Sequence, residues 1–257
     1  MQTITHDGRE TAYRRTDFGD ESAPILYVHG SGGTHEVWTA QYGRQENDAP
    51  AVAIDLSGHG DSDDVDTALG DETLDAYAAD VRAVMRETGA EILVGNSLGG
   101  AVLLHLVLET DVDPGGLVLA GTGAKLTVHP DLRELLAEDF ERAIDVLHGD
   151  DMLFHDPDPA HVEGSKDAMR AVGRAVTERD FLSCHEFDVR DRIDEIDVPT
   201  LALVGEHDSL TPVDFHEYLA DEIPDAELTT IEDAAHLAMI ERPDAFDAAV
   251  DRFRQRL

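Results

Sequence analysis

The 257-residue sequence predicts an α/β fold, a doubly wound and mostly parallel sheet with an inserted helical cap. Short apolar segments alternate with longer amphipathic segments along most of the chain, as strands and crossover helices do in such sheets. The short segments are apolar throughout, which is typical of parallel strands covered on both faces. The alternation is interrupted between residues 125 and 191, where helical patterns follow one another.

Six apolar segments are predicted to form the parallel strands. Each is a short run of apolar or β-branched residues that ends in small or polar ones. Before the first of them, the stretch 13–18 and the turn at 18–22 are expected to supply an antiparallel edge pair. The predicted parallel strands are residues 25–30, 51–58, 91–97, 116–123, 200–208 and 226–233.

The clearest predicted helix covers residues 72–90, with Gly89 as its C-terminal stop. Its apolar face consists of Leu74, Tyr77, Ala78, Val81, Val84 and Met85. A second helix is expected over 98–108. Further along, the helical patterns 131–149 and 165–182 lie on either side of a proline-containing stretch. We interpret residues 125–191 as a helical cap that divides the sheet domain into residues 1–124 and 192–257.

Acidic residues dominate the composition. Asp and Glu number 56 against 19 Lys and Arg, which gives a formal net charge of −37. Such a surface repels nucleic acid and anionic membranes, so we expect a small-molecule substrate and neither of those partners. No window approaches the roughly 18 apolar residues of a membrane span, and the first ten residues lack the pattern of a secretory signal. A cytoplasmic location is therefore expected, while the oligomeric state stays open.

Residues 92–106, ILVGNSLGGAVLLHL, place Asn96 and Ser97 inside a glycine cluster between two apolar runs. A strand must turn here at once into a helix. We expect glycine at 95 and 99 because a β-carbon there would collide with the neighbouring strand or helix. Ser97 is then held above the sheet edge at a helix start, whose free N–H groups favour a developing negative charge. A phosphate-binding turn is the alternative, but the chain lacks G-x-x-x-x-G-K-[ST] and has little positive charge nearby.

The pattern Gly95-x-Ser97-x-Gly99 between a strand and a helix resembles the nucleophile elbow of the α/β-hydrolase family. Two further stretches support the likeness. YVHGSGGTHEVW at 27–38 is similar to the family's His-Gly loop, and DLSGHGDSD at 55–63 is similar to its Asp-x-x-Gly-x-Gly-x-Ser loop. The resemblance covers nearly the whole chain outside the cap.

A serine hydroxyl is a poor nucleophile at neutral pH, so a base must take its proton and an acid must orient that base. The family's chain order is Ser, then Asp or Glu, then His. Asp208 ends the predicted strand 200–208, and His236 follows the strand 226–233. The resemblance therefore implies a catalytic triad of Ser97, Asp208 and His236.

The same resemblance implies an oxyanion hole formed by the backbone N–H groups of Ser31 and Leu98. Trp38, beside this loop, is expected either to contact substrate or to anchor the core. His29 is expected to be structural. Cys184, the single cysteine, excludes an internal disulfide and is expected to fill a small apolar space.

No metal or cofactor is expected. His-Glu occurs at residues 35, 185 and 216, but the second histidine of H-E-x-x-H never follows. The glycines of GNSLGG also do not have the G-x-G-x-x-G spacing of a dinucleotide-binding turn.

We predict a serine hydrolase that cleaves an ester, lactone or thioester through an acyl-enzyme. Serine in the elbow argues against relatives such as haloalkane dehalogenases and epoxide hydrolases, which use Asp there. The alternatives are a carbon–carbon bond hydrolase, a perhydrolase, a lyase of the menaquinone-pathway type or a non-hydrolytic binding protein. Such lyases often carry Arg where this chain has Ala101, and such binding proteins usually lose a triad residue.

The spread of acidic residues and the presence of only two lysines, Lys125 and Lys166, predict adaptation to strong salt. At molar salt the Debye length falls to about 3 Å, so repulsion between surface acids is screened. We expect the unfolding midpoint to rise between low and molar KCl when it is measured by thermal denaturation. A flat or falling midpoint would show that the charge serves another purpose.

Overall fold

The computed structural model describes residues 1–19, 22–43 and 49–257, and within them a sheet of eight strands in the order β1-β2-β4-β3-β5-β6-β7-β8. Strands β3 to β8 pair in parallel, whereas β1 and β2 form an antiparallel edge. The predicted fold class is thereby confirmed. The strands are β1 (Gln2–His6), β2 (Arg9–Thr16), β3 (Ile25–Val28), β4 (Ala51–Ile54), β5 (Ile92–Asn96), β6 (Gly116–Ala120), β7 (Thr200–Gly205) and β8 (Ala226–Ile231).

The antiparallel edge differs from the one that the sequence predicts. Residues 13–16 of the expected stretch lie in β2, where they pair antiparallel with β4. The earlier part of β2 pairs with β1, which a turn at Asp7 and Gly8 with φ of 46° and 81° joins to it. Asp-Gly with two positive φ values is a strong hairpin signal that the sequence reading missed. The expected turn at 18–22 contains residues 20 and 21, which lie outside the described residues.

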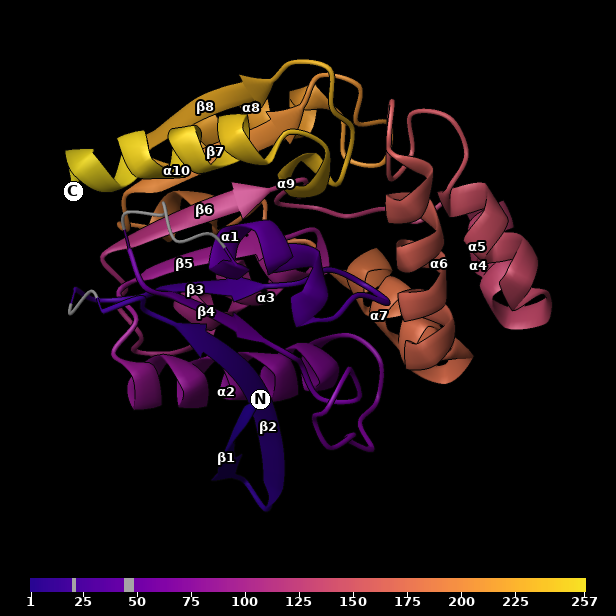
Figure 1. The fold of residues 1–257 in the computed structure, drawn as a ribbon, viewed down its shortest axis with the longest axis horizontal. Helices are drawn as coiled ribbons and strands as arrows, with labels where there is room; N and C mark the ends of the chain where they lie inside the picture. The colour runs from indigo at the N-terminus through magenta and orange to yellow at the C-terminus, as the bar shows by residue number, and fades with distance from the viewer. Residues whose placement is uncertain (20–21, 44–48) are drawn as a thin grey trace.

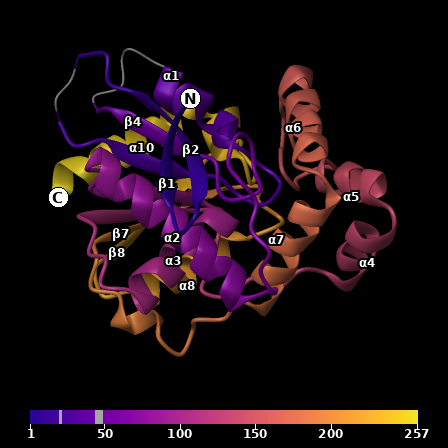
Figure 2. The ribbon, with the colours of Figure 1, turned by 90° about the horizontal axis from the view of Figure 1, so that it is seen from below.

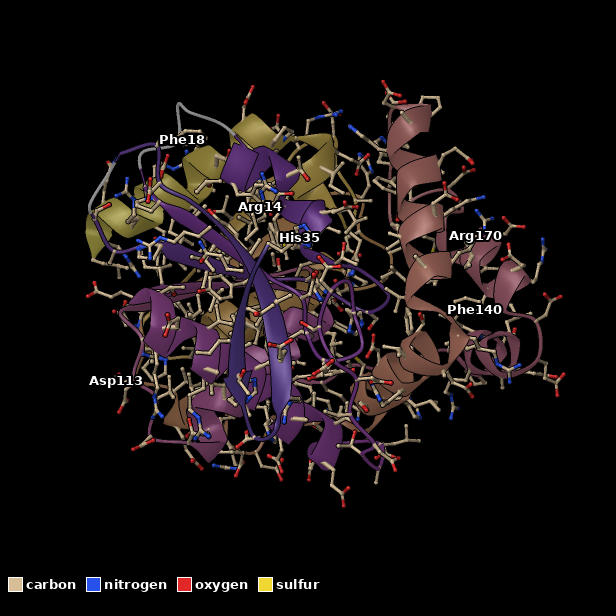
Figure 3. The ribbon with its side chains drawn as sticks, turned by 60° about the horizontal axis from the view of Figure 1, so that its bottom comes forward. Arg14, Phe18, His35, Asp113, Phe140 and Arg170 are labelled. Atoms are coloured by element: carbon tan, nitrogen blue, oxygen red, sulfur yellow. The ribbon has the colours of Figure 1, made fainter. Side chains whose placement is uncertain are left out.

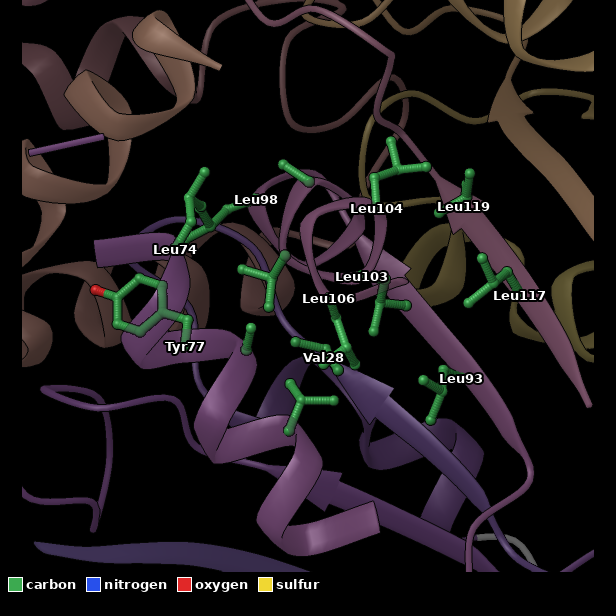
Figure 4. Packing of buried hydrophobic residues seen from close by; sticks show 14 of the residues in the cluster. Val28, Leu74, Tyr77, Leu93, Leu98, Leu103, Leu104, Leu106, Leu117 and Leu119 are labelled. Carbon is green, nitrogen blue, oxygen red and sulfur yellow. The ribbon is translucent and has the colours of Figure 1, made fainter. Parts of the chain in front are cut away.

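Helices cover both faces of the sheet (Figures 1 and 2). One apolar cluster packs α2, α3 and α8 on one face, and a second packs η1, α1 and α10 on the other. Figure 4 shows the first cluster, in which Leu74 and Tyr77 of α2 lie near Leu98 of α3. These elements are η1 (His35–Trp38), α1 (Thr39–Gly43), α2 (Asp71–Thr88), α3 (Leu98–Glu109), η2 (Ile193–Glu195), α8 (Val213–Glu222), α9 (Ala238–Glu241) and α10 (Pro243–Arg256).

Helix α2 forms as predicted. Its expected apolar face is buried except for the partly buried Met85, and Gly89 ends the helix at φ 71° with its N–H on the Met85 carbonyl. None of the helices in the described ranges is long and apolar enough to cross a bilayer.

Four α-helices, followed by the 3-10 helix η2, lie between β6 and β7, and the four lie beside the carboxyl ends of the parallel strands (Figure 1). Each of the two predicted helical patterns forms two helices instead of one. The first is interrupted at Asp139, which caps the helix that follows, and the second at Gly173, whose φ is 86°. Figure 3 shows Phe140 and Arg170 on this segment, at the opposite end of the molecule from Asp113. The helices are α4 (Pro130–Glu138), α5 (Phe140–Leu147), α6 (Pro159–Val172) and α7 (Arg174–Glu186), and we call residues 125–191 the α4–α7 segment.

A buried carboxylate attaches α7 to the sheet domain. Asp180 accepts hydrogen bonds from the Gly32 N–H at 3.1 Å, the His59 imidazole at 2.9 Å and the Tyr77 hydroxyl at 2.7 Å. Burial alone would lower the pKa of His59, but the charge and hydrogen bond of Asp180 outweigh it and raise that pKa. Because a buried charge without such partners is costly, Asp180 fixes the position of α7 against the loop that contains Gly32.

The imidazole of His29 is neutral, and both of its ring nitrogens hold the loop after β3 by hydrogen bonds. Its Nε2 accepts the Leu56 N–H at 3.1 Å, so Nδ1 carries the proton and donates to the Gly30 carbonyl at 2.9 Å. Burial, together with the nearby His59, lowers the pKa of His29 to about 4. The side chain therefore has the structural role that the sequence reading gave it.

The pKa of His29 makes stability depend on pH. The unfolded chain titrates this group near 6.5 and the folded chain near 4, so its contribution to stability is lost as pH falls through that window. His29→Gln, whose amide oxygen can still accept a hydrogen bond, should make the free energy of unfolding depend less steeply on pH. We expect the slope to fall by up to about 1.4 kcal/mol per pH unit.

Urea denaturation at one fixed KCl concentration measures this slope. His161→Gln, an exposed histidine on α6, is the matched control and should leave the slope unchanged. An equal slope in His29→Gln and the unmodified protein would contradict the assignment of a buried, neutral His29.

Candidate active site

The turn from β5 into α3 places Ser97 in a strained conformation, with φ 55° and ψ −118°. A β-carbon on Gly95 would lie 2.5 Å from the carbonyl carbon of Gly99, and one on Gly99 would lie 2.4 Å from the carbonyl oxygen of Val28. Both positions therefore require glycine, as the sequence predicts. A non-glycine residue at positive φ persists only where its surroundings hold it. Here the Ser97 N–H donates to the Ala120 carbonyl at 2.9 Å.

Asp208 and His236 form a buried pair at the ends of two neighbouring strands. Asp208 follows β7 and His236 follows β8, and each is 5% exposed. Nδ1 of His236 donates to Oδ2 of Asp208 at 2.9 Å, which leaves Nε2 as the nitrogen that can accept a proton.

The carboxylate of Asp208 has three further donors. The N–H groups of Leu210 and Thr211 each lie 2.9 Å from Oδ1, and the Thr211 hydroxyl donates to Oδ2 at 2.7 Å. Burial would raise the pKa of Asp208, but the charge and hydrogen bond of His236 and the hydrogen bonds of Thr211 lower it. Asp208 is therefore a fixed, ionised partner for His236. The sequence reading gave Thr211 no role.

Ser97 and His236 line the same cavity, which has a volume of about 620 Å³. Within the described residues no hydrogen bond joins the Ser97 hydroxyl to the imidazole. Catalytic hydrogen bonds of this kind are often long or poorly aligned before a substrate binds. The structure thus brings the three predicted side chains to one edge of the sheet, with the acid and base hydrogen-bonded and the serine on the wall of the cavity that the base also lines.

Asn96 connects the serine turn to the histidine loop. Its buried amide group donates to the carbonyl oxygens of Ala120 and His236, each at 3.3 Å. Gly121, at φ 54°, leaves room for this contact, since a β-carbon there would lie 3.0 Å from Nδ2 of Asn96. In the sequence, the only sign of this role is an amide side chain at the end of an otherwise apolar strand. The residue that Asn96 contacts, His236, lies 140 residues further along the chain.

The two expected oxyanion-hole residues occupy different surroundings. Ser31 lines the cavity. The N–H of the following residue, Gly32, donates a hydrogen bond to Asp180. Leu98 is the first residue of α3, so its N–H has no acceptor within the helix. The side chain of Leu98 is fully buried, and among the described residues Leu98 does not line the cavity.

The wall of the cavity is largely apolar, and most of it comes from the α4–α7 segment. The apolar lining residues of this segment are Leu126, Val128, Leu132, Leu135, Val146, Met152, Leu153, Ala168, Met169 and Phe181. Cys184 also lies on this wall, where burial raises the pKa of its thiol to about 12. Burial therefore disfavours the thiolate, which is the reactive form of cysteine.

The expectation that Trp38 contacts substrate is corrected by the structure. Its indole is fully buried and packs against Tyr27 and Phe246, with ring centroids 5.0 and 5.9 Å apart. In the described part of the chain the cavity lining includes the neighbouring Val37 and not Trp38. The 3-10 turn at 35–38 points the indole into the core, so Trp38 is a core anchor.

The comparisons with known proteins agree with this geometry. Residues 25–249 match the model of the alpha/beta hydrolase family. The pimeloyl-[acyl-carrier protein] methyl ester esterase of Neisseria meningitidis serogroup A is 29% identical over 247 residues, which are 91% of this chain and 77% of the relative. The 3-oxoadipate enol-lactonase 2 of Acinetobacter baylyi is 24% identical over 265 residues, 98% of this chain and 96% of the relative.

A solved structure of a thermophilic esterase superposes with a TM-score of 0.87 at 31% identity and covers 99% of this chain and 97% of its own. The matched family region contains both the serine turn and the acid–base pair. The chain therefore belongs to the alpha/beta hydrolase family and is a hydrolytic enzyme.

Proposed function

We propose that this enzyme hydrolyses a carboxylic ester-like bond, in an ester, a lactone or a thioester, with Ser97 as nucleophile. One observation carries the proposal. A strained serine at the start of a helix lines the same cavity as an imidazole whose other nitrogen is bonded to a buried carboxylate. The relatives named above act on a methyl ester and an enol-lactone, which supports the same bond class here.

In the proposed reaction, Nε2 of His236 takes the proton of the Ser97 hydroxyl as the oxygen attacks the carbonyl carbon. The carbonyl oxygen becomes negative and accepts hydrogen bonds from the N–H groups of Ser31 and Leu98, each donor contributing roughly 3 to 4 kcal/mol. The leaving alcohol receives the proton from His236. Water then attacks the acyl-serine by the same route, which releases the acid and restores Ser97.

Asp208 stays ionised throughout and stabilises the charged imidazole. Its four hydrogen bonds fix the tautomer in which Nδ1 of His236 is the donor. The chemistry needs neither a metal nor a cofactor, because the nucleophile, the base and the oxyanion donors are all groups of the chain.

We propose that the α4–α7 segment is a cap over this site, with the sheet domain as residues 1–124 and 192–257. The largely apolar wall that the segment contributes suits an apolar group on the acyl or the alcohol side. The net charge of −37 and the two lysines support a surface adapted to strong salt, and we place the enzyme in the cytoplasm.

Hydrolysis of p-nitrophenyl esters of increasing acyl length, assayed in molar KCl, tests the reaction. We expect turnover by the unmodified enzyme, and a fall in kcat of about four or more orders of magnitude in Ser97→Ala and in His236→Ala. Ser31→Ala is the matched control and should lose little activity, because its proposed contribution is a backbone N–H.

Circular dichroism verifies that each variant is folded. Retained activity in Ser97→Ala would refute the proposed nucleophile. No turnover of any ester by the unmodified enzyme would favour the alternatives of the same fold, namely carbon–carbon bond hydrolysis, perhydrolysis, lyase chemistry or binding without hydrolysis.

A further inference from the structure

A cluster of three potential metal ligands lies outside the cavity. Asp151 and His155 belong to the stretch between α5 and α6, and His207 lies between β7 and α8, directly before Asp208. One nitrogen from each histidine and one carboxylate oxygen lie within 4.8 Å of one another. The two imidazole rings are stacked, with centroids 3.6 Å apart and an interplanar angle of 11°, and Nδ1 of His155 lies 2.5 Å from Oδ1 of Asp151.

The ligand types point to a particular class of ion. Two imidazoles and one carboxylate are a donor set that Zn²⁺ and similar first-row divalent ions accept, whereas Ca²⁺ and Mg²⁺ prefer oxygen ligands alone. A tetrahedral Zn²⁺ with bonds of about 2.0 to 2.2 Å holds its ligand atoms about 3.4 Å apart. Since the ligand atoms lie within 4.8 Å of one another, no pair has to approach by more than about 1.4 Å, and Nδ1 of His155 and Oδ1 of Asp151 have to separate by about 1 Å if both are ligands.

Side-chain rotation can supply these adjustments. The exposed fractions of the three side chains are 46% for Asp151, 31% for His155 and 34% for His207, so none is locked by packing. The same exposure leaves a fourth position open to water, as in a site with three protein ligands.

Backbone hydrogen bonds hold the two ligand-bearing stretches together. The Ser209 N–H donates to the Asp151 carbonyl at 3.0 Å, which connects the α4–α7 segment to the turn after β7. The carboxylate of Glu241 accepts the His155 N–H at 2.9 Å and the Ala235 N–H at 2.8 Å. These hydrogen bonds hold the backbone of the cluster, so only the side chains need to adjust to a bound ion.

The electrostatic surroundings favour a cation. Glu206 lies 3.8 Å from the imidazole of His207, and the charges of Glu241 and Asp156 also act on His155. In a chain with a net charge of −37 these acids attract divalent cations, and the imidazoles supply the selectivity that carboxylates alone lack.

We propose that Asp151, His155 and His207 bind one Zn²⁺ ion, or a first-row divalent ion of similar chemistry, which crosslinks the α4–α7 segment to the turn that carries Asp208. The ion is structural and takes no part in ester hydrolysis. The inference goes beyond the proposed function, because its ligands contribute nothing to the reaction described above.

Isothermal titration calorimetry with ZnCl₂ tests the site on the full chain, after removal of bound metal with EDTA and dialysis into molar KCl. The salt screens weak binding to surface acids. We expect one Zn²⁺ per chain, with the affinity reduced at least tenfold in His155→Ala and in His207→Ala. His161→Ala, an exposed histidine on α6, is the matched control and should bind Zn²⁺ as the unmodified protein does.

Co²⁺ gives a second readout, because its visible absorption reports tetrahedral coordination by the protein. Asp151→Asn should weaken that absorption without disturbing the backbone, since Asn tolerates the φ of 56° at this position. Circular dichroism verifies the fold, and His155→Gln replaces His155→Ala if the latter does not fold.

The proposal is wrong if the unmodified protein shows no saturable binding, or if the variants of the cluster bind Zn²⁺ as tightly as His161→Ala. Ser97→Ala should bind Zn²⁺ normally, so a failure of the ester assay and a failure of the metal site can be told apart.

Discussion

The close contact between Gly99 and the carbonyl of Val28 is the constraint on which the site depends. It presses the start of α3 against the end of β3 and leaves the chain a single residue, Ser97, in which to turn from strand to helix. The positive φ of that residue follows from this geometry, and with it the position of the hydroxyl at the sheet edge. The loop that contains Ser31 comes from the same end of β3, so one packing contact places the proposed nucleophile and the proposed oxyanion donors.

Buried polar groups hold the other parts of the site relative to that turn. Four fully or nearly fully buried aspartates each contact a histidine, in a chain where lysine and arginine are scarce. Because a buried carboxylate is costly without partners, these histidines help to stabilise the charges, together with Arg9 in the case of Asp80. The pairs are Asp80 with His6, Asp55 with His35, Asp180 with His59 and Asp208 with His236. Asp180 also accepts the Gly32 N–H and so ties α7 to the loop that contains Ser31, and the pair of Asp208 orients the proposed base.

Local patterns in the sequence were sufficient for the fold class and the six parallel strands, whereas the grouping of Ser97, Asp208 and His236 came from the resemblance to the α/β-hydrolase family. Contacts between distant residues were not accessible in this way. Asn96 and Asp180 act through partners far along the chain, so the sequence shows neither partner even where, as with Asn96, the residue itself lies in a motif. A search for two histidines within one helix could not find the cluster at 151, 155 and 207, which two separate turns assemble. Trp38 illustrates the remaining ambiguity, since an aromatic beside a loop fits a pocket wall and a core anchor equally well until the packing is seen.

Covalent labelling with a fluorophosphonate, followed by peptide mass spectrometry, tests the central claim that the turn at Ser97 and the Asp208–His236 pair act as one unit. The account predicts a single adduct on the peptide that contains Ser97, and loss of labelling in His236→Ala, because an unactivated serine reacts poorly. An adduct on another residue, or equal labelling of Ser97 in the folded His236→Ala variant, would contradict it.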